Sequence, residues 1–311
     1  MSEDVWSYDF SGQVYEGLPN SDFAQPRDLE FAPDGKLWIL TAVPSPGDDI
    51  WIYDPVGESY ETLPGSDFID ARDIEFAADG TLWILDNSAG TDDDVWYYDF
   101  AGESYETLPS SYFPDPRDLE FAADGTLWIL ENAAGTDEDI WYYDFGGEFY
   151  DTLPDSYFPD PRDIEIASDG SMWILENAAG TDEDIWRYDF GGEFYETLPD
   201  SGFPEPRDID FAGDDTLWIL ENVGGVSEEI WHYDSVLEEY ATLADSYFED
   251  PLTLEFASDG KLWILDAAAS AALPGLSIPA VLLLAAALGG LALRRLRPPV
   301  FGGPGVTRSR R

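Results

Sequence analysis

A chain of 311 residues with 44% hydrophobic and 15% aromatic residues can fill a packed core, which excludes a disordered acidic polymer despite the formal net charge of -52. All 66 acidic residues lie at or before Asp266, and only eight basic residues accompany them there. Such a surface repels phosphate, which excludes a nucleic acid as partner. The absence of cysteine excludes disulfides and thiolate metal sites.

An internal repeat of 45 residues organises the chain. Every tryptophan belongs to one of two series with this spacing, namely Trp6, Trp51, Trp96, Trp141, Trp186 and Trp231, and Trp38, Trp83, Trp128, Trp173, Trp218 and Trp263. The six units follow one another without insertion or deletion. This pattern is typical of a repeat architecture in which one supersecondary unit is copied several times.

Each unit predicts four short antiparallel strands, which we call A to D in chain order. In one unit they are residues 117–122, 126–131, 140–144 and 148–153. Asp124-Gly125 is a preferred two-residue hairpin turn between A and B. Residues 132–139 form a polar loop between B and C, and Pro154 ends strand D because proline cannot donate to the ladder. A unit of this size and composition predicts one blade of a propeller.

The two ends of the repeat region complement each other. The chain begins with strands C and D, at residues 5–9 and 13–18, and the last repeat contains strands A and B, at residues 252–257 and 261–266. If the two halves pair, they complete a sixth blade and remove both open sheet edges. We therefore predict an all-β, six-bladed β-propeller over residues 1–266, present as a monomer.

Residues 123–130, Ala-Asp-Gly-Thr-Leu-Trp-Ile-Leu, followed by Trp141-Tyr-Tyr-Asp, resemble the repeats of NHL-type and regulator-type propellers. The resemblance covers residues 4–266. An Asp-Gly turn before an aromatic strand is common to many propellers, so the resemblance implies an architecture and not an activity.

The last part of the chain has a different composition. We divide it into a linker at residues 267–277, a transmembrane or sorting helix at residues 278–297, and a basic tail at residues 298–311. Residues 276–293 are 18 mostly apolar positions, long enough to span a bilayer. Three arginines, Arg294, Arg295 and Arg297, follow at once. Because such residues stay cytoplasmic, we expect the propeller to lie on the cell surface or outside the cell.

Leu273-Pro-Gly-Leu-Ser-Ile-Pro279, the apolar run and the arginines together resemble sorting signals of the PEP-CTERM type. The resemblance implies processing by a membrane transpeptidase, and a plain membrane anchor is the alternative. Export also requires a signal peptide, and Met1-Ser-Glu-Asp-Val has neither a basic nor an apolar region. We therefore expect the natural start to lie upstream.

Strand A carries a repeated pattern of charge. An arginine opens it in five units, and an acid stands three residues further on in all six. The arginines are Arg27, Arg72, Arg117, Arg162 and Arg207, and the acids are Glu30, Glu75, Glu120, Glu165, Asp210 and Glu255. Because strand A is the innermost strand, we expect these residues to ring the central channel, joined by arginine–carboxylate bonds between blades. A site for a cation or polar ligand is the alternative. In the last unit Leu252-Thr253 replaces the arginine and the aspartate, which leaves one gap in the ring.

A second set of acids lies at the B–C loops. Candidate metal ligands there are Asp92, Asp94, Asp137, Asp139, Asp182 and Asp184. Clustered oxygen ligands suit calcium, although the spacing matches no EF-hand. The sequence therefore leaves open a solvated loop or a calcium site.

Nothing in the chain is typical of an active site. His232 is the only histidine, which excludes a Ser-His triad. The units are nearly identical, so no blade carries a distinct catalytic set, and we predict that the protein is not an enzyme. The leading hypothesis is an exported binding module for a protein, a glycan or a cationic ligand. A calcium-dependent, lactonase-like hydrolase or lyase and a structural envelope component are the alternatives.

Overall fold

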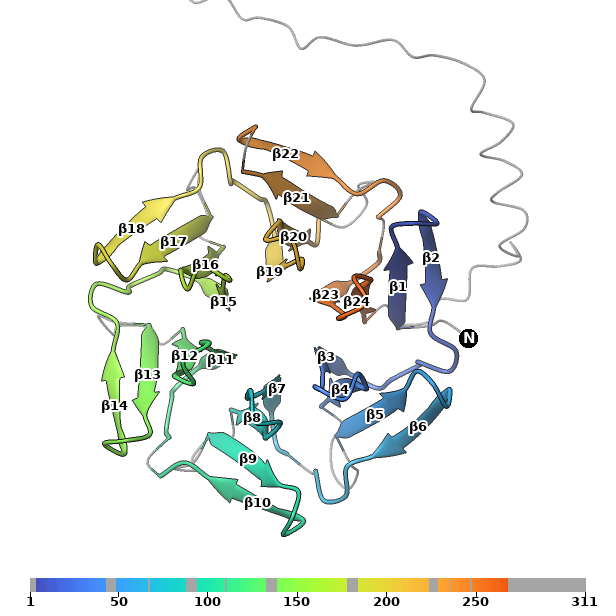
Figure 1. Ribbon diagram of the computed structural model, residues 1–311, viewed down its shortest axis with the longest axis horizontal. Coiled ribbons are helices and arrows are strands. Elements are labelled where there is room, and N and C mark those ends of the chain that lie inside the picture. The colour runs from blue at the N-terminus through green and yellow to red at the C-terminus, as the bar shows by residue number, and fades with distance from the viewer. Residues whose placement is uncertain are drawn as a thin grey trace, which may run out of the picture. The chain divides into compact units, whose positions relative to one another are not determined.

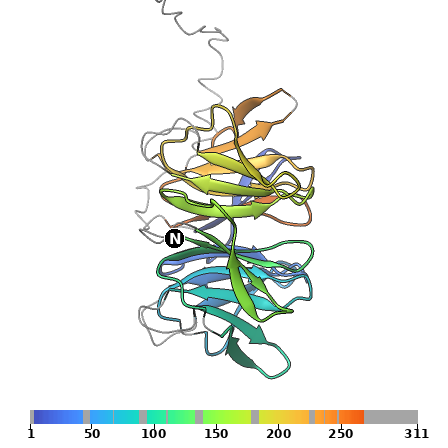
Figure 2. The same ribbon diagram turned by 90° about the vertical axis from the view of Figure 1, so that its left-hand side faces the viewer.

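The four-strand unit predicted from the repeat occurs six times in the structure. The computed structural model describes residues 4–42, 49–66, 68–87, 94–109, 111–132, 139–177, 184–223, 229–235, 237–246 and 248–267. In these residues there are 24 strands and no helix, and the strands form six antiparallel four-stranded sheets around a common centre (Figure 1). Figure 2 shows the ring from its side. The predicted all-β, six-bladed propeller is confirmed.

We number the blades from the N-terminus and write each from its innermost strand outward. Blade 1 is β3 (Pro26–Phe31), β4 (Leu37–Thr41), β5 (Ile50–Asp54) and β6 (Ser59–Thr62). Blade 2 is β7 (Ala71–Phe76), β8 (Leu82–Asp86), β9 (Val95–Asp99) and β10 (Ser104–Thr107). Blade 3 is β11 (Pro116–Phe121), β12 (Leu127–Glu131), β13 (Ile140–Asp144) and β14 (Phe149–Thr152).

Blade 4 is β15 (Pro161–Ile166), β16 (Met172–Glu176), β17 (Ile185–Asp189) and β18 (Phe194–Thr197). Blade 5 is β19 (Pro206–Phe211), β20 (Leu217–Glu221), β21 (Ile230–Asp234) and β22 (Glu239–Thr242). Blade 6 combines both ends of the repeat region: β23 (Pro251–Phe256), β24 (Leu262–Asp266), β1 (Val5–Asp9) and β2 (Val14–Gly17). The pairing of β1 with β24 closes the ring as predicted.

The hydrophobic core lies between neighbouring blades. Strand B is buried on both faces, and in β4 all five side chains are buried. The core therefore divides into six clusters, each built from two successive blades; one of them joins Leu40 and Ile50 of blade 1 to Ile74 and Ile84 of blade 2. This arrangement explains why strand B has a continuous apolar sequence and strands C and D alternate.

A β-bulge opens strand A in every blade. In blade 1, Pro26 stands opposite Thr41 and Asp28 stands opposite Leu40, so Arg27 has no partner in the register. The same shift occurs at Arg72, Arg117, Arg162 and Arg207, and at Leu252 in blade 6. A bulge re-aims a side chain at the end of a strand. Here it sets the arginine apart from the aspartate that follows it.

The predicted tail, residues 278–297 and 298–311, lies outside the described residues, as does nearly all of the linker. Within the described part of the chain, no helix is long and apolar enough to cross a membrane. The membrane helix, the sorting signal and the cell-surface location therefore stay predictions.

Candidate functional site

A pocket of about 350 Å³ lies at one mouth of the central channel, where strand A of each blade begins. Its lining is Gln25, Pro26, Arg27, Arg72, Arg117, Arg162, Arg207, Leu252 and Ala267. The five arginines predicted to ring the channel therefore do come together. In blade 6 the same position is Leu252, so the ring of positive charge has one apolar gap.

The arginines pair mainly with acids that precede them by two residues, and not with the acids of strand A. Nη2 of Arg72, Arg117 and Arg162 lies 2.6–2.7 Å from the carboxylates of Asp70, Asp115 and Asp160. The predicted contact between blades is found at Arg27, whose Nη2 lies 3.6 Å from Asp70 of blade 2.

Arg207 is the least tightly held of the five arginines. Its nearest carboxylate, that of Glu205, is 3.9 Å away, and 35% of its side chain is exposed. It also neighbours the gap at Leu252. Arg207 and Arg27, which is 38% exposed and flanks the same gap from blade 1, are thus the mouth arginines best placed to exchange their partners for a ligand.

Below the arginines, aspartates form a chain of contacts around the channel. Asp28 and Asp73 lie close enough for each carboxyl to affect the pKa of the other, and the pattern continues through Asp118 and Asp163 to Asp208. Two carboxylates in contact cannot both be ionised without strong repulsion, so this chain must hold protons between its members. Sequence reasoning noted that an aspartate follows each arginine, but it missed their mutual contact.

Each aspartate of the chain also accepts a backbone N–H from the next blade. Ile74 N lies 3.0 Å from Oδ2 of Asp28, and Ile209 N lies 2.7 Å from Oδ2 of Asp163. The chain ends in blade 6, where Thr253 replaces the aspartate and donates its hydroxyl to Asp208 over 2.9 Å. The aspartates thereby join the blades, which is the role that the sequence suggested for the arginines.

The second predicted ring of acids, Glu30, Glu75, Glu120, Glu165, Asp210 and Glu255, also faces neighbouring blades around the channel. Burial, followed by the charge of Glu75, holds the pKa of Glu30 well above its usual range, and burial followed by Glu120 does the same for Glu75. Burial raises the pKa of Glu120 and of Asp210 to about 8. These acids therefore keep protons near neutral pH.

The aspartate chain shows the same electrostatic effect. Burial raises the pKa of Asp73 to about 6 and that of Asp208 to about 7, while hydrogen bonds from neighbouring groups oppose the rise. Carboxyl groups with pKa values this close to neutrality can both accept and release a proton at physiological pH. The channel mouth thus combines guanidinium groups with carboxyls able to act in proton transfer.

The candidate calcium ligands divide between described and masked positions. Asp92, Asp137 and Asp182 lie outside the described residues. Asp94, Asp139 and Asp184 are buried, and each accepts the backbone N–H of a phenylalanine 19 residues later, at 2.5–2.6 Å. They fasten the D–A connection to the start of strand C. Among the described residues, no group of three or more histidines or acids is placed to share a metal ion, so we derive no step through calcium.

Asp94 offers a test of this structural role. Replacing it by alanine leaves the buried N–H of Phe113 without its acceptor, which costs about 1–3 kcal/mol. We expect Asp94→Ala to lower the thermal midpoint by about 2–10 °C and Asp94→Asn to lower it by less, because an amide oxygen still accepts. Thermal unfolding with and without calcium checks this. A deficit that appears only when calcium is present would contradict the structural role, because calcium would then stabilise the parent through Asp94.

His232 lies far out in blade 5, away from the channel mouth. It stands opposite Trp218 in the β20–β21 ladder, and its ring packs against that indole with centroids 4.9 Å apart. Its position supports the prediction that no catalytic triad is built on it.

No family model matches this chain, and no curated protein sequence does. Solved structures do match. They include virginiamycin B lyase from Staphylococcus aureus, with 19% identity, a TM-score of 0.54 and coverage of 80% of each chain. An inactive histidine-to-alanine variant of that lyase was solved with quinupristin. It has 17% identity and a TM-score of 0.56, and the match covers 84% of this chain and 87% of that one. A gluconolactonase from Xanthomonas campestris has 13% identity and a TM-score of 0.62, and the match covers 79% of this chain and 87% of that one.

The chain shares the six-bladed propeller fold of these enzymes. Identities this low show the fold alone. Because enzymes share this fold, the repeat architecture does not exclude catalysis, and our prediction that the protein is not an enzyme is contradicted. The reason for the error lies in blade 6. Near-identity of the units was the argument against catalysis, but in blade 6 Leu252 interrupts the arginine ring and Thr253 ends the aspartate chain, which makes that sector unlike the others.

Proposed function

We propose that this propeller is a lactone hydrolase whose active site is the sector of the channel mouth formed by Arg207, Asp208, Leu252 and Thr253. The observation that carries the proposal is that, beside one break in the repeat, a loosely held arginine of the channel mouth is followed in strand A by a carboxyl with a pKa of about 7. The gluconolactonase among the structural neighbours supports the choice of reaction.

The chemistry follows from the charges. Asp208 as a carboxylate takes a proton from water, whose oxygen attacks the lactone carbonyl carbon. Negative charge then builds on the carbonyl oxygen, where Arg207 stabilises it. As the ring C–O bond breaks, the protonated Asp208 returns its proton to the leaving alkoxide, and the product is a hydroxy acid. Thr253 orients Asp208 by donating a hydrogen bond from its hydroxyl. Leu252 offers an apolar surface to the lactone ring.

The alternative reaction, elimination by a lyase, has weaker support. The lyase among the neighbours is inactive when a histidine is replaced by alanine. In this chain the one histidine, His232, packs on Trp218 and lies outside the channel mouth. The carboxyl is therefore the stronger candidate for the proton-transferring group.

The test is an assay of acid release from glucono-1,5-lactone and a five-membered aldonolactone, with matched variants in the broken and unbroken sectors. We expect Asp208→Asn to lower kcat about 100-fold or more and Arg207→Gln to lower it on the order of 100-fold. Asp118→Asn and Arg117→Gln make the same changes where the arginine ring is intact. We expect the kcat of each to stay within about threefold of the parent's. The activity of the parent should rise with pH around 7, since the base must be ionised.

Two results would overturn the proposal. One is the absence of turnover above buffer for both lactones. The other is an equal loss of activity in the two sectors, because the break at blade 6 would then have no catalytic role. Thermal melts of all four variants show whether each is folded.

A further inference from the structure

A second break in the repeat lies between blades 4 and 5, in residues distinct from the channel mouth. In four blades a phenylalanine after strand C covers the strand-B tryptophan of the preceding blade. These pairs are Phe100–Trp38, Phe145–Trp83, Phe190–Trp128 and Phe10–Trp218, with ring centroids 5.3–6.1 Å apart. At the equivalent position of blade 5 the residue is Ser235. Trp173 of blade 4 therefore lacks the phenyl ring that covers four of its counterparts. Blade 1 has Pro55 at this position, so Trp263 of blade 6 lacks the ring as well.

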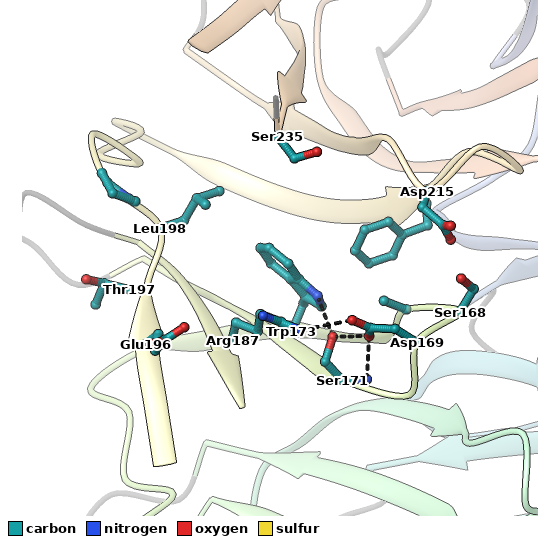
Figure 3. A pocket seen from close by; sticks show the side chains of 13 residues that line it. Ser168, Asp169, Ser171, Trp173, Arg187, Glu196, Thr197, Leu198, Asp215 and Ser235 are labelled. Atoms are coloured by element: carbon teal, nitrogen blue, oxygen red, sulfur yellow. Dashed lines mark hydrogen bonds and ion pairs between the residues drawn. The ribbon is translucent and has the colours of Figure 1, made fainter. Parts of the chain in front are cut away.

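Trp173 is the one strand-B tryptophan of the six that is not buried, whereas Trp263, with Pro55 in place of the phenylalanine, stays buried. The strand-B tryptophans Trp38, Trp83, Trp128, Trp218 and Trp263 are 5–9% exposed, whereas Trp173 falls in the half-buried range. A pocket of about 430 Å³ opens beside Trp173 (Figure 3). Phe211, whose ring centroid lies 5.7 Å from that of Trp173, and Leu198 add apolar surface to it. The volume suits a small ligand.

Two further departures from the repeat meet at the same pocket. Arg187 replaces the hydrophobic or aromatic residue found at this position in most blades, and its guanidinium carbon lies 6.0 Å from the centre of the Trp173 ring. Asp215 stands where the other five A–B turns have glycine, and it holds a positive φ of 64°. Aspartate tolerates this conformation better than most residues, so the substitution adds a carboxylate while the turn keeps its shape. Three single changes thus converge on one cavity.

The charges of the lining favour a cation. Nη2 of Arg187 lies 2.8 Å from Oδ2 of Asp169, so this pair neutralises itself. The exposed carboxylates of Glu196 and Asp215 remain at the rim, as Figure 3 shows around Trp173. An ammonium group can lie near these acids while an aromatic ring fills the space left by the missing phenylalanine.

We propose that this pocket binds an arylalkylamine, a benzene-sized ring with an ammonium group a few bonds away. The ring takes the place that Phe145 and Phe190 occupy over the tryptophans of other blades. The ammonium lies among Glu196, Asp215 and the Asp169–Arg187 pair. The site shares no residue with the proposed lactone-hydrolase site and does not depend on it.

The test is calorimetric titration of the full chain with 2-phenylethylamine, compared with 3-phenylpropionate and propylamine. We expect one site with a Kd of about 1 mM or below for the aromatic amine, and binding at least tenfold weaker for the other two. Ser235→Phe restores the residue of the other blades and should weaken binding at least tenfold. Ser235→Ala, which keeps the space open, should bind as the parent does.

A second variant that moves the site to another blade shows whether a loss of binding in Ser235→Phe comes from misfolding. Adding Phe145→Ser, Tyr97→Arg and Gly125→Asp to Ser235→Phe uncovers Trp83 instead of Trp173 and supplies the charges of the original pocket beside it. We expect this variant to bind 2-phenylethylamine again. The inference is overturned if the parent does not bind the amine, if Ser235→Phe binds it as tightly as the parent, or if 3-phenylpropionate binds as tightly as the amine. Failure of this variant to bind, with Trp83 uncovered and the charges in place, overturns the assignment of the ring to the uncovered tryptophan.

Discussion

Removing residues 1–19, and with them β1 and β2, is expected to abolish cooperative folding of the propeller. Val5, Tyr8 and Leu18 are buried, and the loss of three such side chains costs roughly 5–9 kcal/mol. This is comparable to the total stability of about 5–15 kcal/mol of a typical domain. The deletion also exposes the edge of β24, which pairs with β1 in the closed ring. We expect aggregation or a thermal midpoint lower by more than about 10 °C, measured by circular dichroism.

A circular permutant shows whether the truncated chain is unstable because the ring is open or because residues 1–19 are missing. In it, Asp266 is joined to Asp4 by the linker sequence of residues 132–138, so that blade 6 becomes continuous and the new N-terminus lies at residue 20. All strand pairs are then retained. We expect its thermal midpoint to lie within about 5 °C of the parent's. A truncated chain that melts like the parent would contradict the importance of ring closure.

Stability is expected to fall as the pH rises from about 4 to about 8. The folded pKa values of the channel acids are raised, to about 6 for Asp73, about 7 for Asp208 and about 8 for Glu120 and Asp210. The folded state then binds more protons than the unfolded state, whose acids titrate near 4. The stabilisation is complete below that unfolded pKa and is lost as the pH passes through the folded values. Thermal melts at pH 5 and pH 8 measure this directly.

Glu120→Gln separates the effect of the channel acids on the pH dependence of stability from the effect of the acidic surface, which also lowers stability as the pH rises. The amide stays neutral at every pH, so we expect this variant to raise the thermal midpoint by at least about 2 °C at pH 8 and by less at pH 5. Glu16→Gln makes the same substitution at an exposed position of β2 and should change the two midpoints about equally. If the two variants respond alike to pH, Glu120 does not hold a proton in the channel.

Local sequence predicted the blade well because its signals act over short distances. The two tryptophan series set the repeat, Asp124-Gly125 set the A–B turn, and Gly125 indeed takes a positive φ of 88° there. The positions of Arg27 and Glu30 at the channel also followed, since strand A is innermost in a propeller. What did not follow was the partner of each charge. Arg72 reaches back to Asp70, because the bulge at that position turns it away from the acids of strand A.

The prediction that the protein is not an enzyme failed for a similar reason. Sequence reasoning compared whole units and found them nearly identical, whereas both proposed sites depend on single departures that meet across blades. Leu252 and Thr253 meet Arg207 and Asp208 only when the ring closes. Ser235 matters only because it faces Trp173, 62 positions earlier in the chain.

The sequence by itself determined the six blades, the position of ring closure and the charged residues of strand A, because periodicity and turn chemistry are local properties. Only the tertiary structure decided that the aspartates after the arginines touch one another, that their pKa values are raised, and that one tryptophan is left uncovered. Each of these depends on side chains from two neighbouring blades and on their shared exclusion of water. Neither contact nor burial between blades is encoded in any single repeat.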